Sequence, residues 1–501
     1  MKLAELKNKR ILILGFAREG VDNFRFLRKV FPDKTLGVGD RLKISNFKFQ
    51  ISNLIKKDKK LKLHLGRNYL KSLKNYDLII KSPGIPPKTI KPFLKKGQIV
   101  TSQTEIFFEN CPGKIIGVAG TKGKSTTASL IYKILKQGGY KAHLVGNIGK
   151  PVLSLLSSAT RALAKGGDES LDSSASQKDI YVYEISSHQL MNLKKGPAVA
   201  ILLNIYPDHL DYYKNFKEYA KSEQKIAHYL TKDDYLIFNP ADKLVLEAAK
   251  VSKAKKIPIN PKIVEKFIKI KDIPLEGKFY FLNIAAAIEV GKIFEIPAEK
   301  IKKAIKEFKS PPHRLELVGE YQGIKFYNAS LAVIPETTIA IMEGLGEKVQ
   351  TIFLGGFDRD LNYQELAQKI LKSKIKTIIL FPTSGEKIWR EIEKKAQKNK
   401  NRNLPRHFFV DRAKSTSSSS SPRAKSTSSS SSPRAKSTSS SSSPSPRYGA
   451  AQYMKEGVRI AYQFTEKGKI CLLAPASASF GLFKDYRERG NLFKKYVKKS
   501  P

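Results

Sequence analysis

Short apolar segments that end at a glycine or a loop recur from one end of the chain to the other. Segments of this length, followed by stretches with helical spacing, are typical of strands buried on both faces of a parallel sheet. The predicted strands are Ile11–Gly15, Asp77–Ile80, Ile115–Gly120, Tyr181–Ile185, Ala198–Asn204, Thr351–Gly355, Thr377–Phe381 and Cys471–Pro475. Because these strands are spread over the whole chain, we predict an α/β fold throughout.

Two interruptions of this pattern divide the chain. The strand pattern restarts after Asn110, and the pair Pro311-Pro312 ends the helical stretch Ala298–Lys309, because the residue before a proline disfavours the helical conformation. The length of 501 residues agrees with several domains of about 100 to 200 residues each. We therefore predict three domains, at residues 1–110, 111–311 and 312–501.

Two polar segments look like insertions. Residues 157–178 are rich in Ser, Ala, Gly and Asp, and residues 412–447 contain three copies of the 11-residue unit Arg-Ala-Lys-Ser-Thr-Ser-Ser-Ser-Ser-Ser-Pro. The repeats carry no large apolar side chain, so burial cannot repay the entropy of ordering them, and we expect a disordered surface loop. A phosphorylated or RNA-binding segment is the alternative.

The string Gly117-Val-Ala-Gly-Thr-Lys-Gly-Lys-Ser-Thr126 follows a predicted strand and opens a helical stretch. Glycines let backbone N–H groups surround phosphate oxygens at a helix N-terminus, a lysine reaches the terminal phosphates, and the following serine can bind Mg²⁺. This string predicts an ATP site. Its residues are Gly120, Thr121, Lys122, Gly123, Lys124, Ser125 and Thr126.

Two further polar side chains follow predicted strands in the same region. Glu184 lies at the end of the strand Tyr181–Ile185, and His209 lies in the loop after Ala198–Asn204. Ligands of α/β proteins bind at the carboxyl ends of the strands. Together with Ser125, these side chains are candidates for a Mg²⁺ site completed by phosphates and water.

The spelling Gly-Thr-x-Gly-Lys-Ser resembles the Mur ligase family and the related folylpolyglutamate synthases. Ile11–Gly20 and Ser82–Pro86 are similar to the UDP-binding first domain of Mur ligases, which the synthases lack, and they favour the D-glutamate-adding branch. The resemblance implies a Rossmann-like UDP-binding domain, a central P-loop ATPase domain and a C-terminal Rossmann-like domain. The implied UDP-substrate residues are Gly15, Ala17, Arg18, Asp40, Arg41, Ser82, Pro83, Gly84, Asn147 and Ser186.

The last third of the chain carries the remaining motifs. Pro312–Glu316, Leu354–Arg359, Ala474–Phe480 and Phe483–Gly490 resemble the third domain of the same family. The resemblance implies that Arg314, with Asn283 of the central domain, contacts ATP. The implied amino-acid-binding residues are Arg359, Ser479, Phe480 and Tyr486.

The reaction implied by this resemblance is ATP- and Mg²⁺-dependent amide formation in cytoplasmic peptidoglycan precursor synthesis. The carboxylate of UDP-N-acetylmuramoyl-L-alanine would attack the γ-phosphate of ATP, and D-glutamate would open the acyl phosphate. Such chemistry depends mainly on positioning and on charge neutralisation. We expect a monomer without nucleic-acid or membrane partners.

One departure concerns the metal site. In this family a lysine carbamylated by CO₂ lies four residues after a tyrosine, which here is Tyr219, and this register puts Glu223 in that place. We hypothesise that Glu223 supplies the carboxylate directly. The alternatives are a slip of two residues, which would select Lys225, and a solvated Glu223. The predicted catalytic residues are Lys124, Glu184, His209 and Glu223, and the predicted metal ligands are Ser125, Glu184, His209 and Glu223.

Further departures lie nearer the C-terminus. The family's Asn-Asp-Ser-Lys-Ala-Thr-Asn-Pro is replaced by the segment Asn328–Pro335, with Ala329, Leu331 and Val333 in place of the acid, the lysine and the threonine. A nucleotide motif keeps only its last residue, Asn283. A related ligase with another amino-acid specificity, or a weakly active homologue that binds UDP-sugars or ATP, therefore remains an alternative.

Charge changes this picture little. Lys and Arg outnumber Asp and Glu by 92 to 45, a net charge of +47, which ordinarily raises nucleic acid as a partner. The repeats hold only a small part of this excess, and the rest is spread over the three predicted domains, so a nucleic-acid-binding NTPase is the weaker alternative. Two distant cysteines, Cys111 and Cys471, and no apolar run of about 18 residues favour a cytoplasmic protein.

Overall fold

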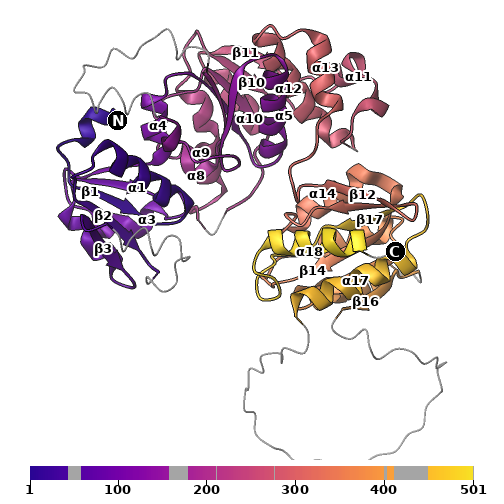
Figure 1. Cartoon of the computed structure of the whole chain (residues 1–501). Helices are drawn as coiled ribbons and strands as arrows, with labels where there is room; N and C mark the ends of the chain where they lie inside the picture. The colour runs from indigo at the N-terminus through magenta and orange to yellow at the C-terminus, as the bar shows by residue number, and fades with distance from the viewer. Residues whose placement is uncertain are drawn as a thin grey trace, which may run out of the picture. The chain divides into compact units, whose positions relative to one another are not determined.

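A computed structural model describes residues 1–42, 58–156, 179–209, 212–275, 277–399, 403–410 and 449–499. Both predicted inserts lie outside these ranges. The chain forms two compact units, one of Met1–Leu275 with Tyr280–Phe308 and the other of Glu276–Phe279 with Lys309–Pro501 (Figure 1). The first unit holds two sheets and the second holds one.

The first sheet is parallel, with strand order β3-β2-β1-β4-β5. Its strands are β1 (Ile11–Leu14), β2 (Leu36–Asp40), β3 (Leu61–Leu65), β4 (Leu78–Lys81) and β5 (Ile99–Thr101), and its helices are η1 (Leu3–Leu6), α1 (Arg18–Val30), η3 (Tyr69–Asn75), α3 (Pro87–Ile90), η4 (Lys91–Phe93) and α4 (Gln103–Asn110). Every residue of β1 is fully buried, as expected for a central strand covered on both faces.

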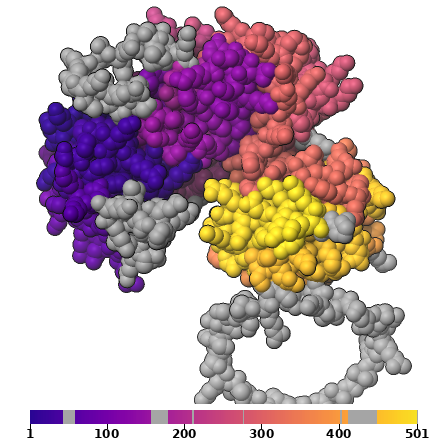
Figure 2. Space-filling model, viewed as in Figure 1, coloured from indigo at the N-terminus to yellow at the C-terminus, as the bar shows by residue number. Residues whose placement is uncertain are grey.

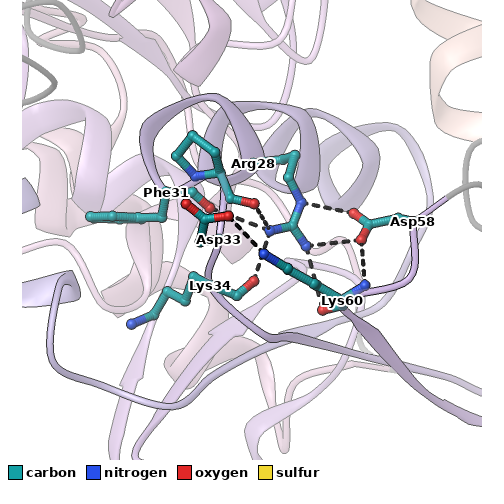
Figure 3. Close-up of polar contacts among 7 residues, drawn as sticks. Arg28, Phe31, Asp33, Lys34, Asp58 and Lys60 are labelled. Atoms are coloured by element: carbon teal, nitrogen blue, oxygen red, sulfur yellow. Dashed lines mark hydrogen bonds and ion pairs between the residues drawn. The ribbon is translucent and has the colours of Figure 1, made fainter.

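A cluster of ion pairs fixes the end of α1 to the strands that follow it (Figure 3). Arg28 pairs with Asp58 through Nε and Oδ2 at 2.8 Å, and Lys60 pairs with Asp33 at 2.7 Å. The Arg28 guanidinium also donates to three carbonyls beyond the helix, those of Phe31, Pro32 and Lys34. Because Arg28 and Asp58 are largely shielded from water, at 22% and 14% side-chain exposure, this pair is screened less than an ordinary surface pair.

The second sheet is also parallel, with strand order β11-β10-β9-β6-β8-β7. Its strands are β6 (Lys114–Ala119), β7 (Lys141–Gly146), β8 (Asp179–Glu184), β9 (Val199–Leu202), β10 (Tyr235–Phe238) and β11 (Lys255–Pro258). Its helices are α5 (Lys124–Gln137), η5 (Leu153–Leu155), α8 (Ser187–Leu190), α9 (Phe216–His228), α10 (Lys243–Val251), α11 (Ile263–Phe267), η6 (Ile270–Asp272), α12 (Phe281–Ile293) and α13 (Ala298–Lys306).

Buried polar contacts join these two sheets into one unit. Asp22 of α1 accepts hydrogen bonds from the Leu153 N–H at 3.1 Å and from the Gln103 side chain at 3.0 Å. Thr104 of α4 and Tyr183 of β8 pair through their hydroxyls at 3.0 Å. Apolar residues of both sheets also belong to one core cluster. The first sheet is therefore held in a fixed position against the second.

The third sheet has strand order β12-β13-β17-β14-β15-β16 and is parallel except for the hairpin of β12 and β13. Its strands are β12 (Glu316–Tyr321), β13 (Ile324–Asn328), β14 (Val349–Gly355), β15 (Thr377–Phe381), β16 (Arg406–Phe409) and β17 (Ile470–Leu473). Its helices are α14 (Pro335–Leu345), η8 (Gly346–Lys348), α15 (Gln364–Lys372), α16 (Ser384–Lys398), α17 (Ala450–Phe464) and α18 (Tyr486–Lys499); η7 (Lys278–Tyr280) lies where the chain changes unit. In Figure 2, yellow side chains of α18 lie on the visible face of this unit.

The predicted α/β class is confirmed, and a strand lies at each of the eight predicted positions. The division into three domains at residues 1–110, 111–311 and 312–501 stays a prediction, because the contacts divide the chain into two units. Among the helices that the structure describes, none is both long and apolar enough to cross a membrane.

The second unit contains a fully buried arginine, Arg489, near the start of α18. No described carboxylate forms an ion pair with it. Its guanidinium instead donates to the Ser330 hydroxyl at 3.1 Å and to the carbonyls of Ser330, Ser477 and Ala478 at 2.8, 3.1 and 3.3 Å. Arg489 therefore ties the loop after β13 to the loop after β17.

Replacing Arg489 with Met should lower the stability of the second unit by about 3 kcal/mol, because four buried oxygen acceptors lose their donor. The midpoint of the corresponding thermal transition of the full chain, measured by calorimetry, should fall. Arg487→Met at a neighbouring exposed position is the matched control. Equal midpoints for the two variants would contradict this role of Arg489.

Candidate active site

The phosphate-binding loop connects β6 to α5 and has a backbone that requires glycine. Gly120 and Gly123 have φ values of +121° and +88°, which residues with a side chain rarely adopt. A Cβ at Gly123 would lie 2.2 Å from the Asn283 amide nitrogen, and one at Gly120 would lie 3.0 Å from backbone atoms of Asn204. The loop is thus packed directly against the segment after β9 and against α12.

Asn204 holds the next part of the loop. Its carbonyl accepts from the Thr121 N–H at 2.8 Å, its side-chain oxygen accepts from the Lys122 N–H at 2.7 Å, and its side-chain nitrogen donates to the Lys122 carbonyl at 3.1 Å. The Thr121 hydroxyl lies 2.8 Å from that of Tyr219. These contacts fix the loop at the N-terminus of α5, where the helix dipole favours an anion.

Lys124 and Asn283 both contact this loop, and their predicted contacts with ATP stay a prediction. The Lys124 ammonium donates to the carbonyls of Gly120 and Thr121 at 2.5 and 3.2 Å. Asn283 donates to the Thr127 hydroxyl at 2.8 Å and to the Gly123 carbonyl at 3.3 Å. Thr126 is buried in the first turn of α5.

Ser125 and Glu184 form a buried pair beside the loop. The Ser125 hydroxyl donates to Glu184 Oε2 at 2.5 Å, and the two residues are 0% and 2% exposed. Mg²⁺ in proteins is commonly held by one or two carboxylates together with phosphates and water. This oxygen pair at the start of α5 fits such an ion.

Glu223 lies beneath the loop rather than on the surface, so the solvated alternative is wrong. It is 1% exposed, and it accepts from the Gly120 N–H at 2.9 Å and from the Tyr219 hydroxyl at 3.1 Å. Burial raises the pKa of its carboxyl, while the charge of Lys124 and the Gly120 N–H oppose that shift. Both carboxylate oxygens are thus engaged, which fits a metal ligand less directly than Glu184 does.

The alternative residue Lys225 points elsewhere. Its ammonium donates to the Met191 carbonyl, and two residues along a helix correspond to a rotation of about 200°. Lys225 therefore lies on the side of α9 away from Glu223, and the register that selects Glu223 as the metal-site residue stays a prediction.

His209 is exposed, and its φ is +54°. Its ring lies 4.7 Å from that of His188 and 6.2 Å from that of Tyr219. Within the described ranges, no three His, Cys, Asp or Glu side chains are grouped closely enough to hold a metal on their own. A metal at this loop would therefore depend on ligands from phosphate or water.

A pocket of about 680 Å³ opens at the carboxyl ends of the strands of the first sheet. All predicted UDP-substrate residues except Ser186 line it, namely Gly15, Ala17, Arg18, Asp40, Arg41, Ser82, Pro83, Gly84 and Asn147. Asp40 accepts from the Phe16 N–H at 2.6 Å and from the Leu42 N–H at 2.8 Å. Arg18 donates to the carbonyls of Asn147 and Gly149, so both sheets of the unit form the pocket.

Ser186 contacts the pocket indirectly. Its N–H and hydroxyl donate to the Gln189 side chain at 3.0 and 3.2 Å, and Gln189 donates to Glu19 at 2.9 Å. Glu19 lines the pocket, and burial raises the pKa of its carboxyl to about 7. Sequence reasoning missed Glu19, because the contact between α1 and α8 exists only in the folded protein.

Sequence reasoning also missed Lys81, a 3% exposed residue at the end of β4. Its ammonium donates to the carbonyls of Ser82 and Ile85 at 3.1 and 2.8 Å. Burial lowers the pKa of Lys81 to about 8. Lys81 therefore fixes the loop that forms one wall of the pocket.

The predicted amino-acid-binding residues lie in the second unit, on the loops after β14 and β17 and at the start of α18. The Phe357 N–H donates to the Ala478 carbonyl at 2.9 Å, which brings the segments of Arg359 and Ser479 side by side. Arg359 is exposed, Phe480 is 57% exposed and Ser479 is 3% exposed. The Tyr486 carbonyl accepts from the Ser330 hydroxyl at 2.8 Å.

Arg314 lies before β12 of the same unit. It follows His313, whose ring lies 5.9 Å from that of Tyr486 and whose carbonyl accepts from the Leu331 N–H at 3.2 Å. The predicted contacts of Arg314 with ATP stay a prediction.

A family model described as the Mur ligase middle domain matches residues 118–291. The UDP-N-acetylmuramoylalanine–D-glutamate ligase of Acetivibrio thermocellus is 30% identical, over 98% of this chain and 97% of the relative. The protein of the same name from Clostridium kluyveri is 29% identical, over 88% and 87%. The solved UDP-N-acetylmuramate-alanine ligase of Thermotoga maritima has a similar fold, with a TM-score of 0.52 at 13% identity over 99% and 100% of the two chains. Since the match to the 30% identical relative extends over nearly the whole of both chains and the middle-domain model includes the phosphate-binding loop, the chain belongs to the Mur ligase family.

Proposed function

We propose that this protein uses ATP to join D-glutamate to UDP-N-acetylmuramoyl-L-alanine, a step of peptidoglycan precursor synthesis. The observation that carries the proposal is the nearly full-length match to relatives that bear the name of this ligase. The phosphate-binding loop, with Lys124 and the Ser125–Glu184 pair, supports the ATP-dependent part.

The reaction has two steps. A carboxylate oxygen of the UDP-substrate attacks the γ-phosphorus of ATP, ADP leaves, and an acyl phosphate forms. The amino nitrogen of D-glutamate then attacks the acyl carbon, loses a proton and displaces phosphate. The N–H groups at the start of α5 and the Lys124 ammonium stabilise the negative charge on the transferring phosphate.

Mg²⁺ fits this site through the Ser125 hydroxyl and the Glu184 carboxylate. When bound, the ion neutralises phosphate charge. His209 and Glu223 complete the proposed set. Glu223 also holds the Gly120 N–H and balances the charge of Lys124 beneath the loop.

The 680 Å³ pocket is the proposed site of the UDP-substrate. Arg18 and Arg41 supply positive charge for the diphosphate, and Asp40 holds the loop that begins at Phe16. A substrate that lies across both sheets of the first unit extends toward the phosphate-binding loop, where its carboxylate reacts.

Arg359, Ser479, Phe480 and Tyr486 are proposed to receive D-glutamate. Leu331 and Val333 replace polar residues of the family's motif, and both are only partly buried. This observation favours a related ligase with another amino-acid specificity as the second candidate. The monomeric state, the absence of nucleic-acid and membrane partners and the cytoplasmic location remain predictions.

Phosphate release by the full chain tests the function. With ATP, Mg²⁺, UDP-N-acetylmuramoyl-L-alanine and a panel of D- and L-amino acids, we expect release with D-glutamate. The Lys124→Ala variant should lose at least about 100-fold, because it removes a charge that stabilises the transition state. Lys136→Ala, at an exposed position of the same helix, should keep wild-type activity.

If phosphate is released with a different amino acid and not with D-glutamate, that amino acid is the substrate. No release with any member of the panel, from protein that still binds ATP, would refute the ligase and favour a nucleotide-binding homologue.

Glu223→Gln tests the carboxylate beneath the loop. Gln keeps the size of the side chain but removes the charge that faces Lys124, so we expect kcat to fall about tenfold or more and the Mg²⁺ requirement to rise. Added bicarbonate should change neither protein. Activation by bicarbonate, or an unchanged Mg²⁺ dependence, would be inconsistent with this role. Glu247→Gln, an exposed carboxylate on α10, is the control.

Glu19 gives the UDP-substrate pocket a pH dependence. Because the pKa of Glu19 is about 7, its carboxyl is neutral below that pH and negative above it, where it repels a diphosphate. Between about pH 6 and 7.5, KM for the UDP-substrate should rise roughly threefold in the wild type, which corresponds to about 0.7 kcal/mol. Glu19→Gln should remove this rise, whereas Glu109→Gln should retain it. A Glu19→Gln profile that still rises would exclude Glu19 as its source.

A further inference from the structure

A second pocket of about 540 Å³ lies on the first unit, where the segment before α3 meets the start of α9. It includes no residue of the phosphate-binding loop, and among the described residues Pro86 is the one that it shares with the UDP-substrate pocket. Its lining residues are Pro86, Pro87, Lys88, Met191, Tyr212, Lys214, Asn215, Lys217, Glu218 and Lys221. The proposed function assigns no substrate to this pocket.

Among the described residues, four exposed lysines and one glutamate line this pocket, so positive charge is in excess among them. Glu218 accepts a hydrogen bond from the Lys214 N–H at 2.7 Å, so its carboxylate is engaged with the backbone. Ion pairs between described residues include none of the four lysines, which are Lys88, Lys214, Lys217 and Lys221. The small pocket beside α14 and α15 has the opposite balance of charge, because two carboxylates and one lysine are among its described lining residues.

The placement of these lysines is unfavourable without a counter-ion. Lys217 and Lys221 are four residues apart on α9, so they lie on one face and repel each other. Lys217 is also in the first turn of the helix, where the backbone dipole disfavours a cation. An anion in the pocket would relieve both repulsions.

The opposite wall of the pocket is apolar and is held in place. It consists of Pro86, Pro87, Met191 and the Tyr212 ring. The Tyr212 hydroxyl donates to the carbonyls of Pro83 and Ile85 at 2.9 and 3.2 Å, and its ring lies edge-on to that of His188, with centroids 4.1 Å apart. This wall is suited to a ring or an alkyl group, while the lysines are suited to phosphate oxygens.

We propose that this pocket binds an organic phosphate, with its phosphate groups among Lys88, Lys214, Lys217 and Lys221 and its apolar part against Tyr212 and Met191. The proposal does not depend on the ligase activity. Because Tyr212 holds the segment Pro83–Ile85, which lines the UDP-substrate pocket, a ligand here would contact a wall that both pockets share.

Calorimetric titration of the full chain with ADP and with pyrophosphate tests this proposal. All proteins carry Lys124→Ala to weaken binding at the phosphate-binding loop. The pocket variant adds K214S, K217S and K221S. The matched control adds K250S, K253S and K256S, which remove the same charge from exposed positions in and after α10. A third protein carries K214R, K217R and K221R and keeps every charge.

We expect both probes to bind the parent, the control and the arginine variant, more weakly at higher salt. The pocket variant should lose at least about tenfold in affinity for each probe. ADP should bind at least as tightly as pyrophosphate, because it adds an apolar contact.

The proposal is overturned by equal affinities of the pocket variant and the control, by loss of binding in the arginine variant, or by no binding to the parent. Pyrophosphate binding far more tightly than ADP would overturn the organic part of the ligand. None of these outcomes alters the phosphate-release assay, so the two proposals fail separately.

Discussion

The active site depends on the buried contact between Glu223 and the Gly120 N–H. A carboxylate that is 1% exposed is costly unless it is hydrogen-bonded and near positive charge, and here Tyr219, Gly120 and Lys124 supply both. The same contact fixes the first residue of the phosphate-binding loop to α9. Asn204 fixes the next two residues, so three consecutive residues of the loop are held by the protein at the start of α5.

The parts of the fold that the sequence predicts are those with continuous apolar strands. Central strands such as β6 and β17 are covered on both faces, so nearly every side chain must be apolar. Several missed strands lack this signal for physical reasons, although β10 (Tyr235–Phe238) is apolar and was missed as well. The edge strands β11 and β16 keep exposed side chains, and β2 contains two glycines, one of which lies against Tyr76, where a Cβ would meet the ring at 2.4 Å. Their position becomes clear only when the neighbouring strand is known.

The residues of the candidate site likewise fall into those that the sequence indicates and those that only the folded structure brings together. Residues in contiguous motifs, such as Ser82–Gly84 or the phosphate-binding loop, could be named as candidates from the sequence, because similarity to a family is detected in consecutive residues. Glu19 and Lys81 are not part of such a motif, and their altered pKa values arise from burial between elements that are far apart in the chain. Ser186 is the opposite case. It belongs to a contiguous motif, but Gln189 and Glu19 lie between its side chain and the pocket, so its contact with the UDP-substrate stays a prediction.

The loop after β13 has lost the family's acid and lysine, since Ala329 and Leu331 occupy their positions. Losing the acid and the lysine together leaves the net charge of the loop unchanged. Arg489, whose guanidinium contacts this loop, is still charged and has no ion-pair partner among the described carboxylates. A charge in such a poorly polarisable environment acts over a longer distance than one at the surface. Arg489 also fixes the carbonyls of Ser477 and Ala478, next to Ser479. Arg489 therefore places one positive charge beside the loops that carry the proposed amino-acid-binding residues, even though the family's lysine is absent.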